Sequence, residues 1–200
     1  MSNDILQDKK YLVIDDFVAE SFANKILTDL TNPFFPWYLS RTFLTVKQHE
    51  FEKAKEDYSN IQEYLAFIHV FFSNDDGNTI RNSDTAQIVE DLFRALLTKL
   101  NLNTGEILRC KANFQTQHRN KINGSHNTPH IDNEVPHYAG IYYVNDSDGD
   151  TFLFEGKEEI ARISPKKGRW LFFRGDVLHS ASHPYKSKNR VIINIDFKNE

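Results

Sequence analysis

The sequence predicts a mainly β protein with flanking helices, in which a largely helical N-terminal part covers an all-β sandwich, barrel or jelly roll. Short strand-like segments separated by turn residues fill residues 105–198. The clearest helical periodicity lies before them, at Thr85–Leu100. No repeat or Pro/Gly-rich linker divides the 200 residues. We therefore expect one domain over residues 1–200, with 1–104 as mostly helical support and 105–198 as the β core.

The first elements of the chain are short. Tyr11–Ile14 has the composition of a strand, and Glu20–Leu30 is a helix candidate that ends before Asn32–Pro33. The pattern over Glu50–His69 is compatible with one helix or with a helix that runs into a strand. Residues 31–84 as a whole therefore have no assigned structure or role.

Thr85–Leu100 is the strongest helix. Ile88, Leu92, Leu96 and Leu100 recur at helical spacing and form one apolar face, which a sheet would cover. Ser83 or Asp84 is the expected N-terminal cap, because Ser and Asp side chains accept hydrogen bonds from free backbone N–H groups.

The second half of the chain has the pattern of short strands joined by turns. In the last strand Arg190, Ile192, Asn194 and Asp196 share one face, and Val191, Ile193, Ile195 and Phe197 share the other. If Arg190 points inward, Asn194 and Asp196 do so too and line a polar pocket. The expected strands are Ile107–Gln115, Tyr138–Asn145, Thr151–Glu155, Ile160–Ser164, Trp170–Arg174 and Arg190–Phe197.

Composition excludes several classes of function. The net charge is −4 and the pI about 6.1, which gives no basic footprint for nucleic acid or an anionic membrane surface. No apolar run approaches the roughly 20 residues of a membrane span. Cys110 is the one cysteine, so an internal disulfide and a cysteine-based zinc site are both excluded. We expect a cytoplasmic protein; its oligomeric state is open.

His130 and Asp132 are the first candidates for chemistry. Residues two apart on an extended segment point to the same side, so this imidazole and carboxylate can converge on one cation. Taken alone, this pair is weak evidence for a metal site. In a chain with 8 His and 28 acidic residues, about one triplet of the form His-x-Asp or His-x-Glu is expected by chance. His179, at a turn after a strand, and Arg190, at a strand start, give it context. Two His and one carboxylate form the facial triad of non-heme iron, and Arg suits a dicarboxylate.

These residues stand in an order that resembles a known family, the 2-oxoglutarate- and iron(II)-dependent oxygenases, and most closely its prolyl 4-hydroxylase-like branch. The resemblance covers about residues 105–198 and, more weakly, Tyr11–Val18. It is specific for the superfamily and much less so for the substrate. The segments that carry it are Thr128–Asp132, Ile141–Asn145, Gly149–Thr151, Pro165–Arg169, Leu171–Phe173, His179 and Arg190.

The resemblance implies a double-stranded β-helix (jelly-roll) core and an Fe(II)- and 2-oxoglutarate-dependent dioxygenase that uses dioxygen. By position, His130, Asp132 and His179 match the metal ligands. Arg190 matches the residue that binds the C5 carboxylate of 2-oxoglutarate, and Tyr143 a tyrosine that donates a hydrogen bond to it. One departure is Asp150, where the family often has a second glycine before the next strand.

The implied reaction couples decarboxylation of 2-oxoglutarate to succinate with hydroxylation of a C–H bond. The expected substrate is a peptidyl, prolyl-like residue or a small molecule, with Asn194, Asp196 and His137 at its pocket. A nucleic-acid demethylase of the same superfamily is one alternative, which the acidic pI disfavours. The other is a cupin-like metal-binding module without catalysis, and Arg190 argues against it, since such a module needs no cation opposite the metal.

Overall fold

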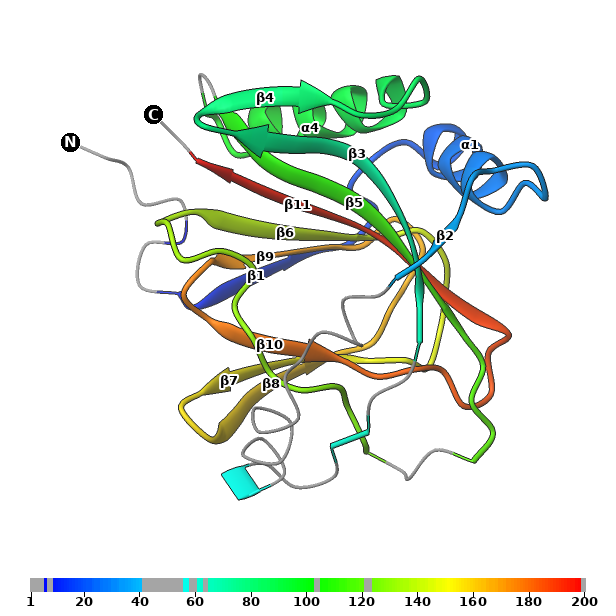
Figure 1. Ribbon diagram of the computed structural model, residues 1–200, viewed down its shortest axis with the longest axis vertical. Coiled ribbons are helices and arrows are strands. Elements are labelled where there is room, and N and C mark those ends of the chain that lie inside the picture. Colours follow the sequence, from blue (N-terminus) through cyan, green and yellow to red (C-terminus); the bar gives the residue numbers. More distant parts are fainter. Residues whose placement is uncertain are drawn as a thin grey trace.

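The computed structural model describes residues 6, 9–40, 56–57, 61–62, 65–102, 105–120 and 124–198. Within these ranges the strands form an eight-stranded and a three-stranded antiparallel sheet. Two helices lie on one side of the large sheet, and the small sheet lies on the other side (Figure 1). Mainly β structure with flanking helices is therefore confirmed, and the two facing sheets are those of a jelly roll.

The large sheet places strands from both halves of the chain side by side. Its central strands, β11 and β5, pair over ten residue positions, from Asn189↔Thr116 to Lys198↔Glu106, with one register shift. In spatial order its strands are β1 (Tyr11–Ile14), β9 (Trp170–Arg174), β6 (Tyr138–Tyr143), β11 (Asn189–Lys198), β5 (Glu106–Thr116), β3 (Phe67–Asp75) and β2 (Tyr38–Leu39), with β4 (Asn78–Arg81) on β3. The small sheet has the order β10 (Leu178–Ala181), β7 (Thr151–Glu155) and β8 (Glu158–Ile163).

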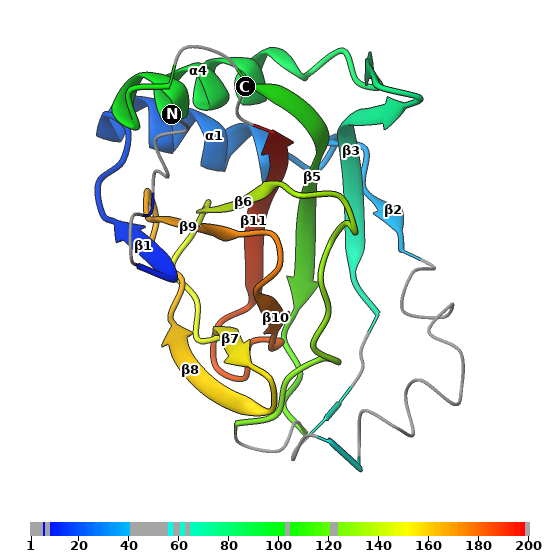
Figure 2. The same ribbon diagram turned by 90° about the vertical axis from the view of Figure 1, so that its left-hand side faces the viewer.

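The helices follow the apolar periodicity of the sequence. Helix α1 (Glu20–Leu30) has the bounds that the sequence predicts, and α4 (Gln87–Lys99) lies inside the predicted Thr85–Leu100. Figure 2 shows α1 and α4 side by side on the outer face of the large sheet. Neither of these described helices is long and apolar enough to cross a membrane.

The predicted cap of α4 is wrong. The residue before the helix is Ala86, and no side chain caps it. The Ser83 hydroxyl instead accepts a hydrogen bond from the Thr85 backbone N–H at 3.2 Å. It therefore stabilises a turn that precedes the helix, and the first helical N–H groups lie beyond its reach.

Two apolar cores lie on opposite faces of the large sheet, and β11 contributes to both. Val191, Ile193, Ile195 and Phe197 pack in the core beneath the helices. Ile192 packs in the second core, between the sheets. The predicted alternation is thus confirmed, and it places Arg190, Ile192 and Asn194 on the inner face, where the two sheets enclose a cavity.

The N-terminal half contains more sheet than the sequence predicts. Besides β1, it supplies β2 and the β3–β4 hairpin. These lie together at the edge of the large sheet opposite β1. Within the undecided segment Glu50–His69, the described residues Phe67–His69 belong to β3, and most of the remainder lies outside the described residues. The four-residue strand β10 is also absent from the prediction.

Candidate metal centre and its cavity

His130 and His179 face each other across a β-bridge. Each backbone N–H donates to the carbonyl of the other residue at 3.0 Å. In such a hydrogen-bonded antiparallel pair the two side chains lie on the same side of the strands. The imidazole centroids are accordingly 4.7 Å apart. His130, which directly follows Pro129 in the loop before β6, is thereby brought next to β10 of the small sheet.

Asp132 completes a three-residue cluster. Its Oδ1 lies 3.7 Å from His130 Nε2, and its Oδ2 lies 3.3 Å from His179 Nε2. The ligand atoms of the three side chains all lie within 4.8 Å of one another. Two imidazole nitrogens and one carboxylate oxygen can therefore bind a single cation, which leaves other coordination positions open for further ligands.

The hydrogen bonds of the two rings suit metal binding. His130 Nδ1 lies 3.0 Å from the Thr128 carbonyl, and His179 Nδ1 lies 3.3 Å from the Val177 carbonyl. A carbonyl only accepts, so each Nδ1 carries a proton, and each Nε2, on the side of its ring that faces Asp132, is the nitrogen left to bind a cation. Such partners orient the histidine ligands of metal sites. On this observation the donor set fits an Fe(II) ion.

Electrostatic interactions favour the metal-binding charge state of Asp132 and His130 but not that of His179. Burial acts to raise the pKa of Asp132, but His179 and Arg109 hold it well below its usual range. Burial acts to lower the pKa of His179, but Asp132 raises it above its ordinary value. Desolvation and the neighbouring His179 lower the pKa of His130 to about 4, although about half of its side chain reaches solvent. A cation that binds here therefore competes with a proton more at His179 than at His130.

Two further side chains hold the Asp132 carboxylate. Asn194 Nδ2 donates to Asp132 Oδ2 at 2.9 Å, and the Arg109 guanidinium pairs with Oδ1. Arg109 also binds Asp196, with Nη2 2.8 Å from Asp196 Oδ2. Burial, then Asp132, raises the pKa of Asp196 to about 6. Arg109 thus lies between two buried carboxylates and keeps Asp132 oriented.

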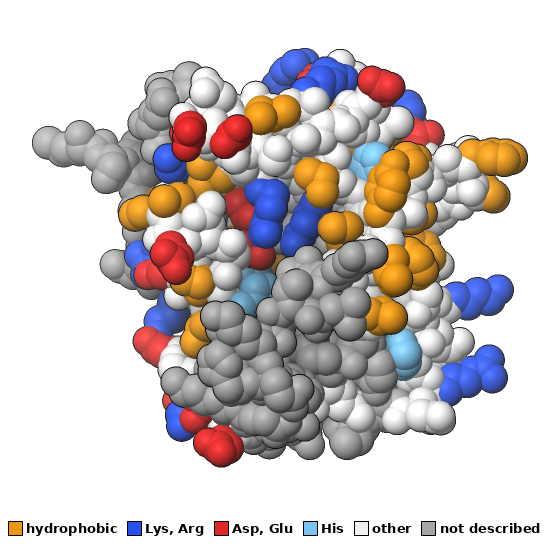
Figure 3. All heavy atoms as spheres, in the orientation of Figure 1, with side chains coloured by type: hydrophobic (Ala, Val, Ile, Leu, Met, Phe, Trp, Pro, Cys, Tyr) orange, Lys and Arg blue, Asp and Glu red, His pale blue; other side chains and the backbone are white. Residues whose placement is uncertain are grey.

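The cluster opens into a cavity of about 270 Å³ between the two sheets. Lys111, Asn113 and Gln115 line it from β5, and Arg190, Ile192 and Asn194 line it from β11. Figure 3 shows Lys or Arg side chains beside carboxylates near the centre of this face of the molecule, with apolar side chains to one side. The cavity therefore presents the cations Lys111 and Arg190 beside the His–Asp–His cluster.

Arg190 is a buried cation in this cavity, with 1% of its surface exposed. Its Nε donates to the Gly149 carbonyl at 2.7 Å, Nη1 to Gln115 Oε1 at 2.6 Å, and Nη2 to Thr151 Oγ1 at 2.7 Å. Among the described residues no carboxylate pairs with it. A guanidinium has five N–H donors, so two remain for a ligand, and a buried unpaired cation favours a carboxylate there.

Tyr143 lies one contact away from the cavity surface. It is fully buried, and its hydroxyl donates to Thr151 Oγ1 at 2.8 Å. Arg190 donates to the same Thr151 oxygen, and Thr151, unlike Tyr143, is among the lining residues. In this structure Tyr143 therefore orients Thr151, and the direct contact that we expect with a cosubstrate carboxylate would require its hydroxyl to change partner.

Of the three expected substrate-pocket residues, Asn194 alone lines the cavity. Asp196 is on the same face but is buried against Arg109. His137 packs its ring on Gly175, where an added Cβ would lie 2.1 Å from the ring, and its Nδ1 bonds the Val135 carbonyl at 2.7 Å. Neither residue is placed to touch a substrate in the cavity. The lining residues Lys111, Gln115 and Thr151 were not predicted, although the polar alternation Lys111–Asn113–Gln115 was visible.

Comparison with solved structures identifies the fold. A prolyl hydroxylase from Trichoplax adhaerens, in complex with a peptide of hypoxia inducible factor, has a TM-score of 0.67 at 15% identity, over 97% of this chain and 86% of that one. A viral collagen prolyl hydroxylase from Paramecium Bursaria Chlorella virus-1 has 0.55 at 14%, over 98% and 99%. The α-ketoglutarate-dependent epimerase SnoN of nogalamycin biosynthesis has 0.55 at 10%, over 95% and 78%. No protein-family model and no curated protein matches the sequence.

Proposed function

We propose that this chain is an Fe(II)- and 2-oxoglutarate-dependent oxygenase. The observation that carries the proposal is the pairing of two features in one cavity. One is a His–Asp–His cluster with both Nε2 atoms directed to the carboxylate. The other is the buried Arg190, which has no carboxylate partner among the described residues. The fold shared with enzymes of this kind supports it.

Each of these residues has one role in the proposal. His130, Asp132 and His179 hold Fe(II). Arg190 binds the distal carboxylate of 2-oxoglutarate, with Thr151 and Gln115 fixing its guanidinium. When bound, Fe(II), 2-oxoglutarate and dioxygen supply the oxidising chemistry, in which decarboxylation to succinate is coupled to oxidation of a C–H bond. Asn194 and Arg109 orient Asp132.

We infer that the substrate is a peptidyl residue or a small molecule, and hydroxylation is the favoured outcome. Two of the similar structures are prolyl hydroxylases, one of which holds a peptide, and another is an epimerase. A nucleic-acid demethylase is disfavoured by the net charge of −4. A reducing compartment such as the cytoplasm suits Fe(II) and the buried thiol of Cys110.

Calorimetric titration without oxygen tests the assignment of the two ends of the cavity. Mn(II) replaces Fe(II), and 2-oxoglutarate is added to the metal-loaded protein. His130→Ala should weaken binding of both, whereas Arg190→Met should weaken binding of 2-oxoglutarate at least about tenfold and leave Mn(II) binding unchanged. Retained 2-oxoglutarate binding in Arg190→Met would contradict the role of Arg190, and Mn(II) binding without any 2-oxoglutarate binding in the wild-type protein would favour the metal-binding module without catalysis.

A further inference from the structure

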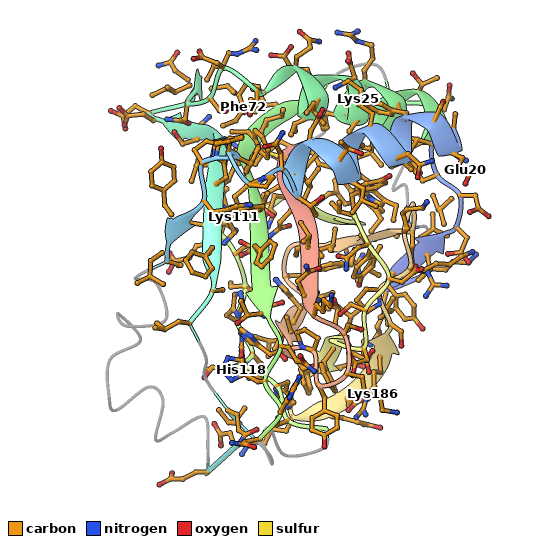
Figure 4. The ribbon with its side chains drawn as sticks, turned by 90° about the vertical axis from the view of Figure 1, so that its right-hand side faces the viewer. Glu20, Lys25, Phe72, Lys111, His118 and Lys186 are labelled. Atoms are coloured by element: carbon orange, nitrogen blue, oxygen red, sulfur yellow. The ribbon has the colours of Figure 1, made fainter. Side chains whose placement is uncertain are left out.

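Lys111 is a cation on the cavity wall with no assigned role. Figure 4 shows Lys111 on β5. It lines the cavity together with Asn113 and Gln115 of the same strand. Across the sheet its partner on β11 is Asn194, whose amide binds Asp132. The charge of Lys111 also lowers the pKa of Asp132 and of His130. Lys111 therefore lies at the end of the cavity that holds the metal-binding cluster.

Arg190 lies at the other end. Its partner on β5 is Gln115, four residues from Lys111 along the strand. Four residues of a strand span about 13 Å. A 2-oxoglutarate molecule that reaches from Arg190 to the metal cluster would therefore leave Lys111 on the far side, where a substrate must approach.

The two cations of β5 near the metal cluster differ in their partners. Arg109, two residues before Lys111 and on the same face, pairs with both Asp132 and Asp196. No carboxylate of the described residues lies within ion-pair distance of Lys111, whose pKa is lowered by burial and by Arg109. Arg109 thus serves the protein's own carboxylates, whereas Lys111 is left for a ligand.

A count of charges in the loaded site supports the same conclusion, and it rests on the proposed function. Asp132 and the 2-oxoglutarate dianion bring three negative charges, and Fe(II) and Arg190 bring three positive charges. Arg109 and Asp196 balance each other. Lys111 is then the uncompensated charge, and one further carboxylate would neutralise it.

We propose that Lys111 binds a carboxylate of the primary substrate, so that the enzyme oxidises a molecule or residue with a carboxylate close to the reacting carbon. The acid is either free or the side chain or C-terminus of a peptide. An amide of the same shape lacks the charge and should bind much less tightly.

The test compares acids with their amides in the full-length protein loaded with Mn(II) and 2-oxoglutarate without oxygen. One set of probes contains N-acetyl-L-proline and the free amino acids, each against its amide. The other contains blocked prolyl peptides with Asp or Glu against Asn or Gln. Binding is measured from the relaxation of probe protons by Mn(II), which does not depend on turnover. Lys111→Met removes the charge, Lys111→Arg keeps it, and Lys25→Met removes an exposed lysine of α1.

We expect at least one acid to bind about tenfold or more tightly than its amide to the wild-type protein and to Lys25→Met. The preference should vanish in Lys111→Met and persist in Lys111→Arg, and the set that contains the preferred acid identifies its source. Absence of any preference in the wild-type protein, or an unchanged preference in Lys111→Met, would overturn the inference while Mn(II) and 2-oxoglutarate still bind. If the wild-type protein binds neither Mn(II) nor 2-oxoglutarate, the proposed function is refuted, and this inference with it.

Discussion

His130 and His179 exchange both of their backbone hydrogen bonds, at 3.0 Å each, and this pairing joins the loop before β6 to the small sheet. The two imidazole rings therefore owe their alignment to backbone pairing. Because His130 lies on a loop and His179 on β10, neither position alone would place the rings 4.7 Å apart.

The first prediction concerns the metal ligands. His179→Ala removes one imidazole and leaves the backbone pairing intact, so the protein should stay folded. Affinity for Mn(II) should fall by about 100-fold or more, because the cluster loses one of its three protein ligands. Calorimetry measures the affinity, and circular dichroism checks the fold. His118→Ala, at a histidine that does not line the cavity, is the control and should bind Mn(II) like the wild type.

Arg109 should stabilise the metal-free protein by neutralising two carboxylates. Arg109→Met leaves Asp132 and Asp196 buried without their cation, which should lower the free energy of unfolding by about 3 kcal/mol. Urea unfolding measures the change. Combining the substitution with Asp196→Asn should recover part of the loss, since one of the two unpaired charges is then removed. Equal stability of Arg109→Met and the wild type would show that the network is not formed in solution.

Gly149 should be required for 2-oxoglutarate binding, although it is expected to touch Arg190 and not the ligand. Its carbonyl accepts the hydrogen bond from Arg190 Nε. A Cβ there would lie 2.6 Å from the Ser182 carbonyl and 2.9 Å from Arg190 Cδ. Gly149→Ala should therefore displace the guanidinium and weaken 2-oxoglutarate binding about tenfold or more, with Mn(II) affinity retained. Gly156→Ala, at a turn whose φ is +58° and outside the lining of the cavity, adds the same methyl group together with backbone strain, and so controls for a loss of stability alone. A normal affinity in Gly149→Ala would mean that Arg190 is not held as described.

Asp148 should make stability depend on pH in acid. Its carboxylate accepts backbone hydrogen bonds from Tyr185, Lys186 and Ser187, in the loop that leads into β11. Burial acts to raise the pKa of Asp148, but these donors lower it below 3.8. Its contribution is therefore complete above about pH 4 and is lost as the pH falls through the lowered pKa. Asp148→Asn should cost about 1 kcal/mol at pH 7 and much less at pH 3, as measured by urea unfolding.

Much of the β core could be predicted because its strands carry their own local signals. Thr151–Glu155 and Trp170–Arg174 are short apolar runs bounded by turn residues, and their predicted bounds match β7 and β9. The β3–β4 hairpin was missed, although Asp76 and Gly77 adopt positive φ at its turn, as an Asp-Gly hairpin turn requires. The run Phe67–Phe72 has apolar residues on both faces, so its period did not separate strand from helix.

The candidate site shows the same division between local and long-range information. His130, Asp132, His179 and Arg190 could be chosen from their order along the chain, and the structure brings all four to one cavity. The hydrogen-bond partners of Arg190 could not be chosen from the sequence. Gln115 lies 75 residues away from Arg190 and is brought opposite it only by the register of β5 and β11. The contact of Arg109 with Asp196 spans 87 residues for the same reason.

The most direct test of the central claim is iron-dependent formation of succinate. The protein is purified without oxygen and given Fe(II) and 2-oxoglutarate, then air, with the acid that it prefers from the binding experiment. The proposed function predicts succinate that requires Fe(II) and is absent in His130→Ala and strongly reduced in Arg190→Met. No succinate above the level of His130→Ala, with Fe(II) and 2-oxoglutarate both bound, would contradict it and would leave a metal-binding module of the same fold.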